Sequence, residues 1–257
     1  MAEVIHIGIL SAMSQEVGSI LEHLETPKEI NYGDLTIFSG YLKKSQNSQN
    51  NIYISLCWSG WGKVSAARAT TRIIAQSEET KPIKLLLFTG VAGAINTELE
   101  QWDVIIGSEL IQHDMDAQPI FPRFVIPPLN KDKLKTKTSL IEWSSKAIKE
   151  SLNKGRLKKF KKVESGLIAT GDKFINDKNI LTELSNAIPN IKAVEMEGAA
   201  FAQVAEQEKI SWLVIRVISD SADESASQNF NEFLNDYKNH SWCLIKSLLD
   251  DIEIIRI

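Results

Sequence analysis

The chain has 257 residues, of which 43% are hydrophobic and 24% charged, and its formal net charge at pH 7 is −4. These values are those of an ordinary globular protein with a large core, and they exclude a broad basic surface for nucleic acid. No apolar run reaches the roughly 20 residues of a membrane span, and two cysteines, Cys57 and Cys243, are too few for a disulfide framework.

The first residues, MAEVIHIGIL, lack the basic segment of a signal peptide, so we expect a cytoplasmic protein. Val4 to Leu10 is predicted to be a strand, followed by a turn at 11–13. Apolar side chains at positions 17, 20, 21 and 24 predict a helix from about Ser14. Glu16 would lie in its first turn, where an acid either complements the helix dipole or takes part in catalysis beyond the strand's end.

The next elements are a hairpin, a helix and a strand. Residues 35–42 and 52–57 alternate as two paired strands, and the turn SGWGK leads into a helix over 64–75. This turn fits neither the dinucleotide-binding nor the phosphate-loop pattern. Residues 83–88 form a buried strand, and the small residues TGVAGA at 89–94 form a loop whose backbone can approach a ligand.

Residues 103–111 form another strand, and the segment HDMD follows it. With only four histidines and no ligand spacing, we expect no metal site there. Residues 117–129 carry prolines at 119, 122, 127 and 128 among large apolar side chains. Such a semi-rigid apolar loop is expected to cover a site or to meet a second subunit.

The following stretch is predicted to contain a helix over 134–152 and a strand over 163–169. The segment GDKFIN at 171–176 comes after that strand. Phe174 is either a core aromatic or a ring that stacks on a ligand. A closing helix is expected from Phe230 onwards, and no linker, repeat or low-complexity segment divides residues 1–257 into domains.

The stretch from Ala193 to Asp223 carries most of the chemistry. A strand end at 193–196 and a helix from Gly198 precede an almost continuous apolar run over 210–218, which is typical of a strand covered on both faces. Asp220 follows where that run ends, so it either caps a turn or acts in catalysis.

Three charged side chains in this stretch need partners. Arg216 interrupts the apolar run, where an unpaired charge is costly, so it requires an acid or a polar ligand. Glu195 and Glu197 would share a strand face because side chains alternate with a period of two. Crowded carboxylates push each other's pKa apart, which lets one site hold both an acid and a base.

VEMEGAA and RVISDSAD resemble the signature of the 5'-methylthioadenosine/S-adenosylhomocysteine nucleosidases of the purine nucleoside phosphorylase superfamily. The similarity runs from about Ile7 to Lys246. Val91 and Ala94 depart from it, since the commoner loop has serine and glycine there. The resemblance implies an α/β fold, with one three-layer domain around a central mixed, partly barrel-like sheet flanked by helices.

The family resemblance also implies a reaction. It is hydrolysis of the N-glycosidic bond of 5'-methylthioadenosine and S-adenosylhomocysteine, without a cofactor, with Glu16 as base and Asp220 as acid. The implied substrate-binding residues are Met13, Ala92, Gly93, Phe174, Ile175, Glu195, Met196, Glu197, Arg216, Ser219 and Phe230. A homodimer is implied as well, with the 112–128 loop near the interface and over the pocket for the sulfur-bearing tail.

Three alternatives stay open. A phosphorylase would need arginines around phosphate, but none precedes Arg68 and the first loop is acidic. A nucleosidase for another purine nucleoside, such as adenosine monophosphate or futalosine, would differ mainly in the 112–128 loop. A catalytically silent nucleoside-binding protein would have no use for both Glu16 and Asp220.

Overall fold

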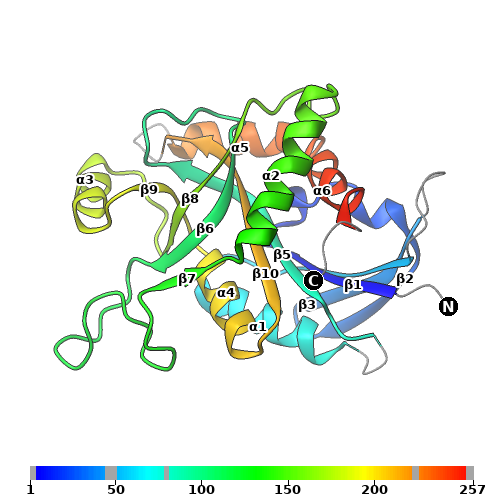
Figure 1. Cartoon of the computed structure of the whole chain (residues 1–257), viewed down its shortest axis with the longest axis horizontal. Coiled ribbons are helices and arrows are strands. Elements are labelled where there is room, and N and C mark those ends of the chain that lie inside the picture. The colour runs from blue at the N-terminus through cyan, green and yellow to red at the C-terminus, as the bar shows by residue number, and fades with distance from the viewer. Residues whose placement is uncertain (1–3, 44–50, 78–80, 222–225, 253–257) are drawn as a thin grey trace.

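The computed structural model describes residues 4–43, 51–77, 81–221 and 226–252 (Figure 1). Its strands form one mixed sheet. The strands are β1 (Val4–Ser11), β2 (Leu24–Tyr32), β3 (Leu35–Leu42), β4 (Asn51–Trp58), β5 (Leu85–Ala94), β6 (Val104–Gln112), β7 (Lys133–Lys135), β8 (Val163–Thr170), β9 (Ile191–Glu195) and β10 (Ser211–Asp220).

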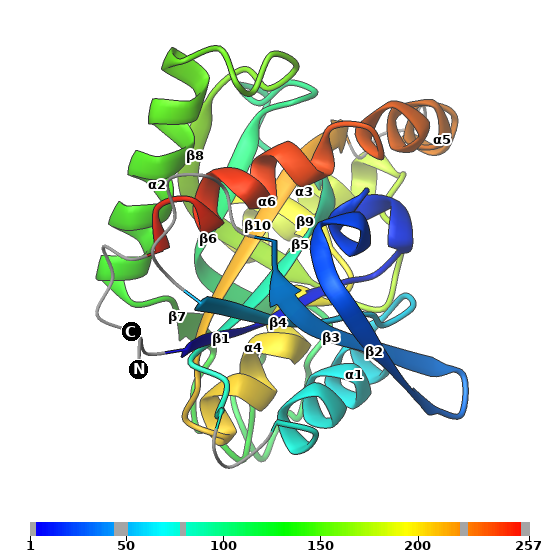
Figure 2. The same ribbon diagram turned by 90° about the vertical axis from the view of Figure 1, so that its right-hand side faces the viewer.

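The sheet has the order β10-β6-β8-β9-β5-β1-β4-β3-β2, and β7 pairs with β6. Because β5 also pairs with β10, the strands β5, β10, β6, β8 and β9 close into a ring. The strands β1, β4, β3 and β2 extend from this ring as an open arm (Figure 2). The predicted mixed, partly barrel-like sheet is therefore confirmed.

Helices cover the sheet on both faces, as the three-layer prediction requires. They are α1 (Lys63–Ala75), α2 (Thr138–Asn153), α3 (Lys178–Ala187), α4 (Gly198–Gln207), α5 (Ala226–Tyr237) and α6 (Ser241–Leu249). Figure 1 shows α1 beside α4 below the sheet, whereas α2 and α6 lie in front of it. None of the helices in the described ranges is both long and apolar enough to cross a membrane.

The core has two halves because the central strands are buried on both faces. On β5, Leu85 and Leu87 pack with residues of α2 and α6, whereas Leu86 and Phe88 pack with α1 and α4. Each fully buried aliphatic side chain contributes about 1.5–3 kcal/mol of transfer free energy. A strand between two such layers needs apolar residues at successive positions, which explains the continuous run in β10.

The predicted helix from Ser14 is wrong. Two short 3-10 turns, Ser14–Glu16 and Ile20–His23, take its place, and Leu24 already begins β2. Between them Gly18 has a φ of 54°, and a Cβ there would lie 2.7 Å from the carbonyl oxygen of Lys238. The close approach of the chain before α6 overrides the helical spacing of the apolar residues.

Other element boundaries also differ from the prediction. The expected loop at 89–94 is the second half of β5, since it pairs with β10 and β9. The helix expected over 134–152 begins only at Thr138, after β7, and the single closing helix is two helices, α5 and α6. The sequence analysis predicted neither β2 nor α3.

Candidate active site

A pocket of about 540 Å³ lies where the carboxyl ends of β1, β5, β8, β9 and β10 converge. This is the usual position of a ligand site in such a sheet. Its lining residues are Ala12, Trp61, Val91, Ala92, Gly93, Lys173, Phe174, Ile175, Val194, Glu195, Met196, Glu197, Ser219, Asp220 and Phe230.

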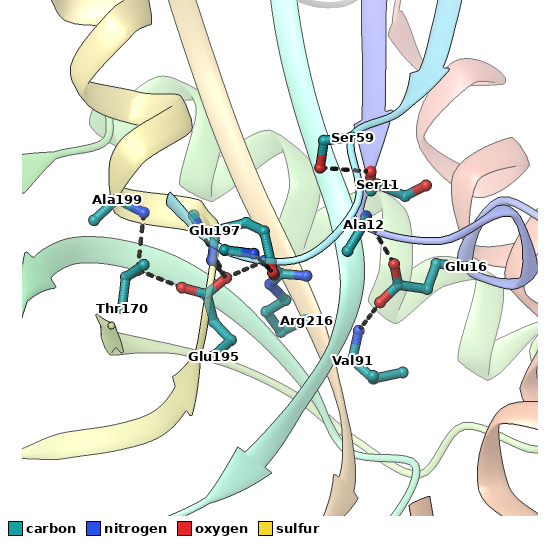
Figure 3. A network of polar contacts seen from close by, with 12 residues as sticks. Ser11, Ala12, Glu16, Ser59, Val91, Thr170, Glu195, Glu197, Ala199 and Arg216 are labelled. Carbon is teal, nitrogen blue, oxygen red and sulfur yellow. Dashed lines mark hydrogen bonds and ion pairs between the residues drawn. The ribbon is translucent and has the colours of Figure 1, made fainter. Parts of the chain in front are cut away.

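Glu16 lies behind one wall of this pocket, and its side chain is buried. Its Oε2 accepts hydrogen bonds from the backbone N–H groups of Ala12 and Met13, each at 2.8 Å. Its Oε1 accepts the N–H of Val91 at 2.9 Å. The backbone between β1 and the 3-10 turn and the backbone of β5 thus hold the carboxylate in one fixed orientation; Figure 3 shows its contacts with Ala12 and Val91.

A second acidic group surrounds Arg216, which is fully buried in β10. Its Nη2 donates to Oε2 of Glu195, which is the close partner, and to Oε2 of Glu197 at 3.3 Å. Figure 3 shows these three side chains gathered at the start of α4. The expectation that Arg216 needs acidic partners is therefore confirmed.

Glu195 and Glu197 meet for a different reason from the one predicted. They do not share a strand face, because β9 ends at Glu195 and Glu197 is the residue before α4. Oε2 of Glu195 instead accepts the backbone N–H groups of Glu197 and Gly198, at 3.1 and 2.8 Å. Glu195 therefore caps the turn that brings Glu197 back towards Arg216.

Gly90 lies between the two acidic groups. A Cβ at this position would collide with Nη1 of Arg216 and with Oε1 of Glu16. The guanidinium and the Glu16 carboxylate thus flank the same backbone position on β5. Within the described part of the chain, Nε and Nη1 of Arg216 have no hydrogen-bond partner, so this cation has donors left for a ligand or water.

Burial raises the pKa of two of these carboxyl groups. The pKa of Glu16 is raised because burial outweighs the opposing effects of Arg216 and of the three backbone N–H groups. Burial, with Glu195 nearby, raises the pKa of Glu197 to about 8 despite the attraction of Arg216. Both groups therefore hold protons more tightly than an exposed glutamate does.

Ser219 and Asp220 end β10, which pairs with β5 along the edge opposite to the one that contacts Glu16. The pairing of β10 with β5 shifts register between Ile218 and Asp220, and such a bulge re-aims the side chains beside it. The Ser219 hydroxyl donates to Oδ2 of Asp220 at 2.6 Å and lies 3.3 Å from the carbonyl oxygen of Ala92. Asp220 thus faces the pocket with a fixed partner.

The two catalytic candidates are separated by a single strand. The N–H of Val91 points to Glu16, and the carbonyl of the next residue, Ala92, points to Ser219 beside Asp220. Backbone groups of consecutive strand residues point to opposite edges. The pocket over the end of β5 is therefore flanked by one carboxyl group on each side.

Aromatic side chains form another wall. Phe174 meets Phe230 edge to face with ring centroids 5.9 Å apart, and Ile175 beside it is buried. The loop carrying Phe174 is tied to α1, since Oδ1 of Asp172 accepts the N–H of Lys63 at 2.7 Å. This wall offers a flat apolar face and backbone polar groups, the combination that an aromatic base requires.

Most of the predicted binding residues line the pocket, with two exceptions besides the buried Glu16. Arg216 does not line the pocket but pairs with Glu195 and Glu197, which do. Met13 does not line it; its contribution is the N–H that holds Glu16. The sequence analysis did not name five of the lining residues as binding residues, namely Ala12, Trp61, Val91, Lys173 and Val194. Trp61 stands in a strand-to-helix turn, where ligand-facing residues are common.

The HDMD segment forms an ion-pair network. Asp114 accepts Nζ of Lys63 at 2.6 Å and the backbone N–H of Asp172 at 2.9 Å. Over the ranges that the structure describes, no group of three His, Cys, Asp or Glu side chains is placed to hold a metal ion. This network fixes the start of α1 against the Phe174 loop.

Comparison with known proteins places this site in context. The model of the phosphorylase superfamily matches residues 6–250. The chain is 35% identical to a 5'-methylthioadenosine/S-adenosylhomocysteine nucleosidase of Glaesserella parasuis, over 89% of this chain and 91% of that protein.

Solved structures agree with this comparison. The nucleosidase of the same name from Neisseria meningitidis, in complex with methylthio-immucillin-A, has a TM-score of 0.83 and 31% identity and covers 95% of this chain and 98% of its own. A futalosine hydrolase of Helicobacter pylori has a TM-score of 0.81 and 30% identity, with coverage of 96% and 97%. The fold and these relatives thus point to the same chemistry.

Proposed function

Since this chain belongs to the phosphorylase superfamily, and within it to the 5'-methylthioadenosine/S-adenosylhomocysteine nucleosidases, we propose that it hydrolyses the N-glycosidic bond of these two nucleosides. The products are adenine and the corresponding thioribose. The observation that carries the proposal is the pair of carboxyl groups, Glu16 and Asp220, held on opposite edges of β5 at one pocket.

Glycosidic hydrolysis needs an acid on the leaving group and a base for water on the other face of the sugar. Asp220 delivers a proton to N7 of adenine, and Ser219 orients its carboxyl group. Glu16 takes the proton of the attacking water. Arg216, whose Nη1 lies across Gly90 from Glu16, helps to hold that water together with Glu195.

The remaining pocket residues hold the nucleoside. Phe174 stacks on adenine, while the backbone of Ile175 and the small residues Ala92 and Gly93 border the base. Glu197 bonds the ribose hydroxyls, Met196 packs against the sugar, and Phe230 closes the pocket beside Phe174. No step in this scheme requires a cofactor.

We also propose that the chain acts as a homodimer in the cytoplasm, in methionine salvage. Support for the dimer comes from Val64 and Ile120, which are 80% and 83% exposed. These apolar side chains belong to two segments that the Lys63–Asp114 ion pair joins, at the start of α1 and in the 112–128 loop. Exposed apolar side chains at adjoining segments are typical of a protein interface.

Adenine release from 5'-methylthioadenosine is expected to be the same with and without phosphate. The reason is that the pocket lining contains three acids and no arginine among the described residues, and Arg216, which does not line it, is already paired with Glu195. The measurement is adenine and sugar product by chromatography. Turnover that appears only with phosphate and yields a sugar 1-phosphate would establish a phosphorylase instead.

Glu197→Gln is expected to lower kcat/KM by an amount that grows with pH. Below pH 8 the wild-type group is largely protonated, and the amide resembles that form. Above pH 8 the wild type presents a carboxylate, whose hydrogen bonds contribute about 1.5–3 kcal/mol against about 0.5–1.5 for neutral ones. The penalty should therefore reach about tenfold or more at pH 9.

The 2'-deoxy analogue of the substrate supplies the control for Glu197→Gln. It lacks one hydroxyl that Glu197 would bond, so the penalty on it should be smaller at every pH. Equal penalties on both substrates, or a penalty that does not change with pH, would remove Glu197 from ribose recognition.

A further inference from the structure

Tyr237, the last residue of α5, is a buried polar side chain that the proposed reaction scheme leaves without a role. The residue is fully buried, and within the described part of the chain its hydroxyl has no hydrogen-bond partner. Buried hydroxyls are nearly always paired, because an unpaired one costs free energy that a phenylalanine at the same place would not. The presence of tyrosine at this position therefore needs an explanation.

The chain around Tyr237 packs on the turn that carries Glu16. α5 contacts both that 3-10 turn and β10. A Cβ at Gly18 would lie 2.7 Å from the carbonyl oxygen of Lys238, the residue after Tyr237. The Ser241 hydroxyl donates to the carbonyl oxygen of Gln15 at 3.2 Å. The end of α5 and the start of α6 are thus fixed against the residues on either side of Glu16.

Three polar side chains act on the Tyr237 hydroxyl, namely Glu16, Thr89 and Arg216. Burial raises the pKa of Tyr237, and the negative charge of Glu16 raises it further, whereas Thr89 and Arg216 lower it by smaller amounts. The phenol therefore keeps its proton at every pH at which a glutamate titrates. It is a permanent hydrogen-bond donor near a buried carboxyl group.

Aromatic neighbours hold the ring of Tyr237 in place. Phe233, one turn earlier in α5, stacks on it with ring centroids 5.7 Å apart. Trp102 and Phe160 meet the same ring at 6.1 and 6.4 Å. Because the ring is enclosed in this way, its hydroxyl cannot turn outwards to find a partner in solvent.

Other titratable groups surround the pair formed by Glu16 and Tyr237. Those described on the neighbouring elements are Arg216 and Asp220 on β10, Glu195 and Glu197 before α4, and Asp236, Lys159 and His240 on the outer side of α5. Arg216 lowers the pKa of Glu16, and Glu16 and Glu197 oppose each other's ionisation. Asp236 pairs with Lys159 and His240, and all three are partly exposed, so solvent screens their charges.

We propose, on the basis of the proposed function, that Tyr237 is a positioning residue that stabilises the charged, base form of Glu16. A buried donor near a carboxylate favours the anion, either directly or through one bridging water. Arg216 favours the same form, so the two groups partly offset the burial that protonates Glu16. Tyr237 does not line the pocket, and its effect on the reaction runs through Glu16.

Tyr237→Phe removes the hydroxyl and keeps the ring. Without the donor the anion of Glu16 is less stable, so the acidic limb of kcat against pH should move up by about one pH unit, the scale of one hydrogen bond to a charged group. At a pH below that limb, kcat on 5'-methylthioadenosine should fall about tenfold. KM and the plateau at higher pH should change little, because the pocket lining is intact.

Phe233→Leu is the matched control. Phe233 is buried and stacks on Tyr237, so this change disturbs the same aromatic cluster without removing a polar group. It should lower the melting temperature and leave the acidic limb where it is. A second control is Tyr237→Phe in a Glu16→Gln background, where the residual kcat should no longer respond to the loss of the hydroxyl.

Infrared spectroscopy provides a measurement that does not depend on turnover. The carbonyl stretch of protonated Glu16 is recognised as the band that Glu16→Gln lacks, and its intensity against pH gives the midpoint of protonation. In Tyr237→Phe this midpoint should lie about one pH unit higher than in the wild type, in step with the acidic limb. Phe233→Leu should keep the wild-type midpoint.

The outcomes separate the inference from the proposed function. An unchanged midpoint in Tyr237→Phe, with equal or greater stability, would overturn the inference and leave the hydroxyl as an unpaired group without effect on Glu16. An equal shift in Phe233→Leu would also overturn it, since packing alone would then move the midpoint. No adenine release from 5'-methylthioadenosine at any pH would overturn the proposed function, whereas the infrared midpoints would still decide the role of Tyr237.

Discussion

Asp220→Asn is expected to lower kcat by about 10² to 10⁴, the usual contribution of a general acid. The amide keeps the size of the carboxyl group and can still accept the Ser219 hydroxyl, which now donates to Oδ2 at 2.6 Å. It has no proton to give to N7 of the leaving base. The nucleoside should therefore still bind, with a dissociation constant close to the wild-type KM, while turnover nearly stops.

Asp103→Asn provides a matched control for that variant. Asp103 is also buried, lies just before β6 and accepts the N–H of Glu100 at 2.8 Å, but it does not line the pocket. This change should lower the melting temperature without lowering kcat. If Asp220→Asn behaved in the same way, with normal turnover in a less stable protein, Asp220 would be a structural residue.

The parts of the fold that the sequence predicted well are those with two-sided burial. β10 was recognised because nearly every residue from 210 to 218 is apolar, and a strand between two helical layers leaves no exposed face. Arg216 was recognised for the complementary reason. A single charge in such a strand must meet an acid, and the structure supplies Glu195 and Glu197.

The parts that failed are those in which distant contacts override local spacing. Apolar residues from 17 to 24 have helical spacing, yet Gly18 adopts a positive φ and packs against the chain before α6. No local sequence pattern predicts a packing contact with a residue more than two hundred positions away. The small residues at 89–94 predict a loop. The structure makes them a strand because β10 and β9 pair with them, and no local pattern indicates that pairing.

In the candidate site, too, the residue types could be predicted from the sequence but their arrangement could not. The acids were predictable as residue types, because carboxyl groups at strand ends are few and chemically distinctive. Their geometry was not, since Glu195 meets Glu197 through a capped turn rather than along a strand. Trp61 and Lys173 were missed because an aromatic residue in a turn and an exposed lysine are common, and only the folded chain brings them to the pocket.

The variant Glu16→Gln is expected to lower kcat about 10² to 10⁴-fold, since an amide cannot accept the proton of the attacking water. The structure also predicts that this variant is less stable than the wild type. Glu16 is buried and accepts three backbone N–H groups, so an amide must turn its NH₂ towards at least one of them. A buried unpaired donor costs about 1–3 kcal/mol, which lowers the melting temperature by several degrees in a domain of this size.

A fall in melting temperature therefore does not tell a base from a structural residue, and ligand binding must decide. Phe174, Ile175 and Asp220 remain intact in Glu16→Gln, so adenine should bind with nearly the wild-type dissociation constant while turnover is lost. A variant that is less stable but hydrolyses at the normal rate would show that Glu16 only holds the first loop against β5.

The pH dependence supplies the second half of this test. Burial raises the pKa of Glu16 above its ordinary value of 4.5, and a base must be deprotonated to act. Wild-type kcat should thus fall as pH falls through that raised pKa.

The raised pKa of Glu16 has the opposite effect on the stability of the fold. The protonated group stabilises the fold fully below 4.5, and this contribution is lost as pH rises through the folded-state pKa. The glutamine variant has no such group, so its deficit in melting temperature should be largest in acid and should shrink towards neutral pH. The same group that gains activity with rising pH loses stability over the same range, and a role confined to structure would not link the two profiles.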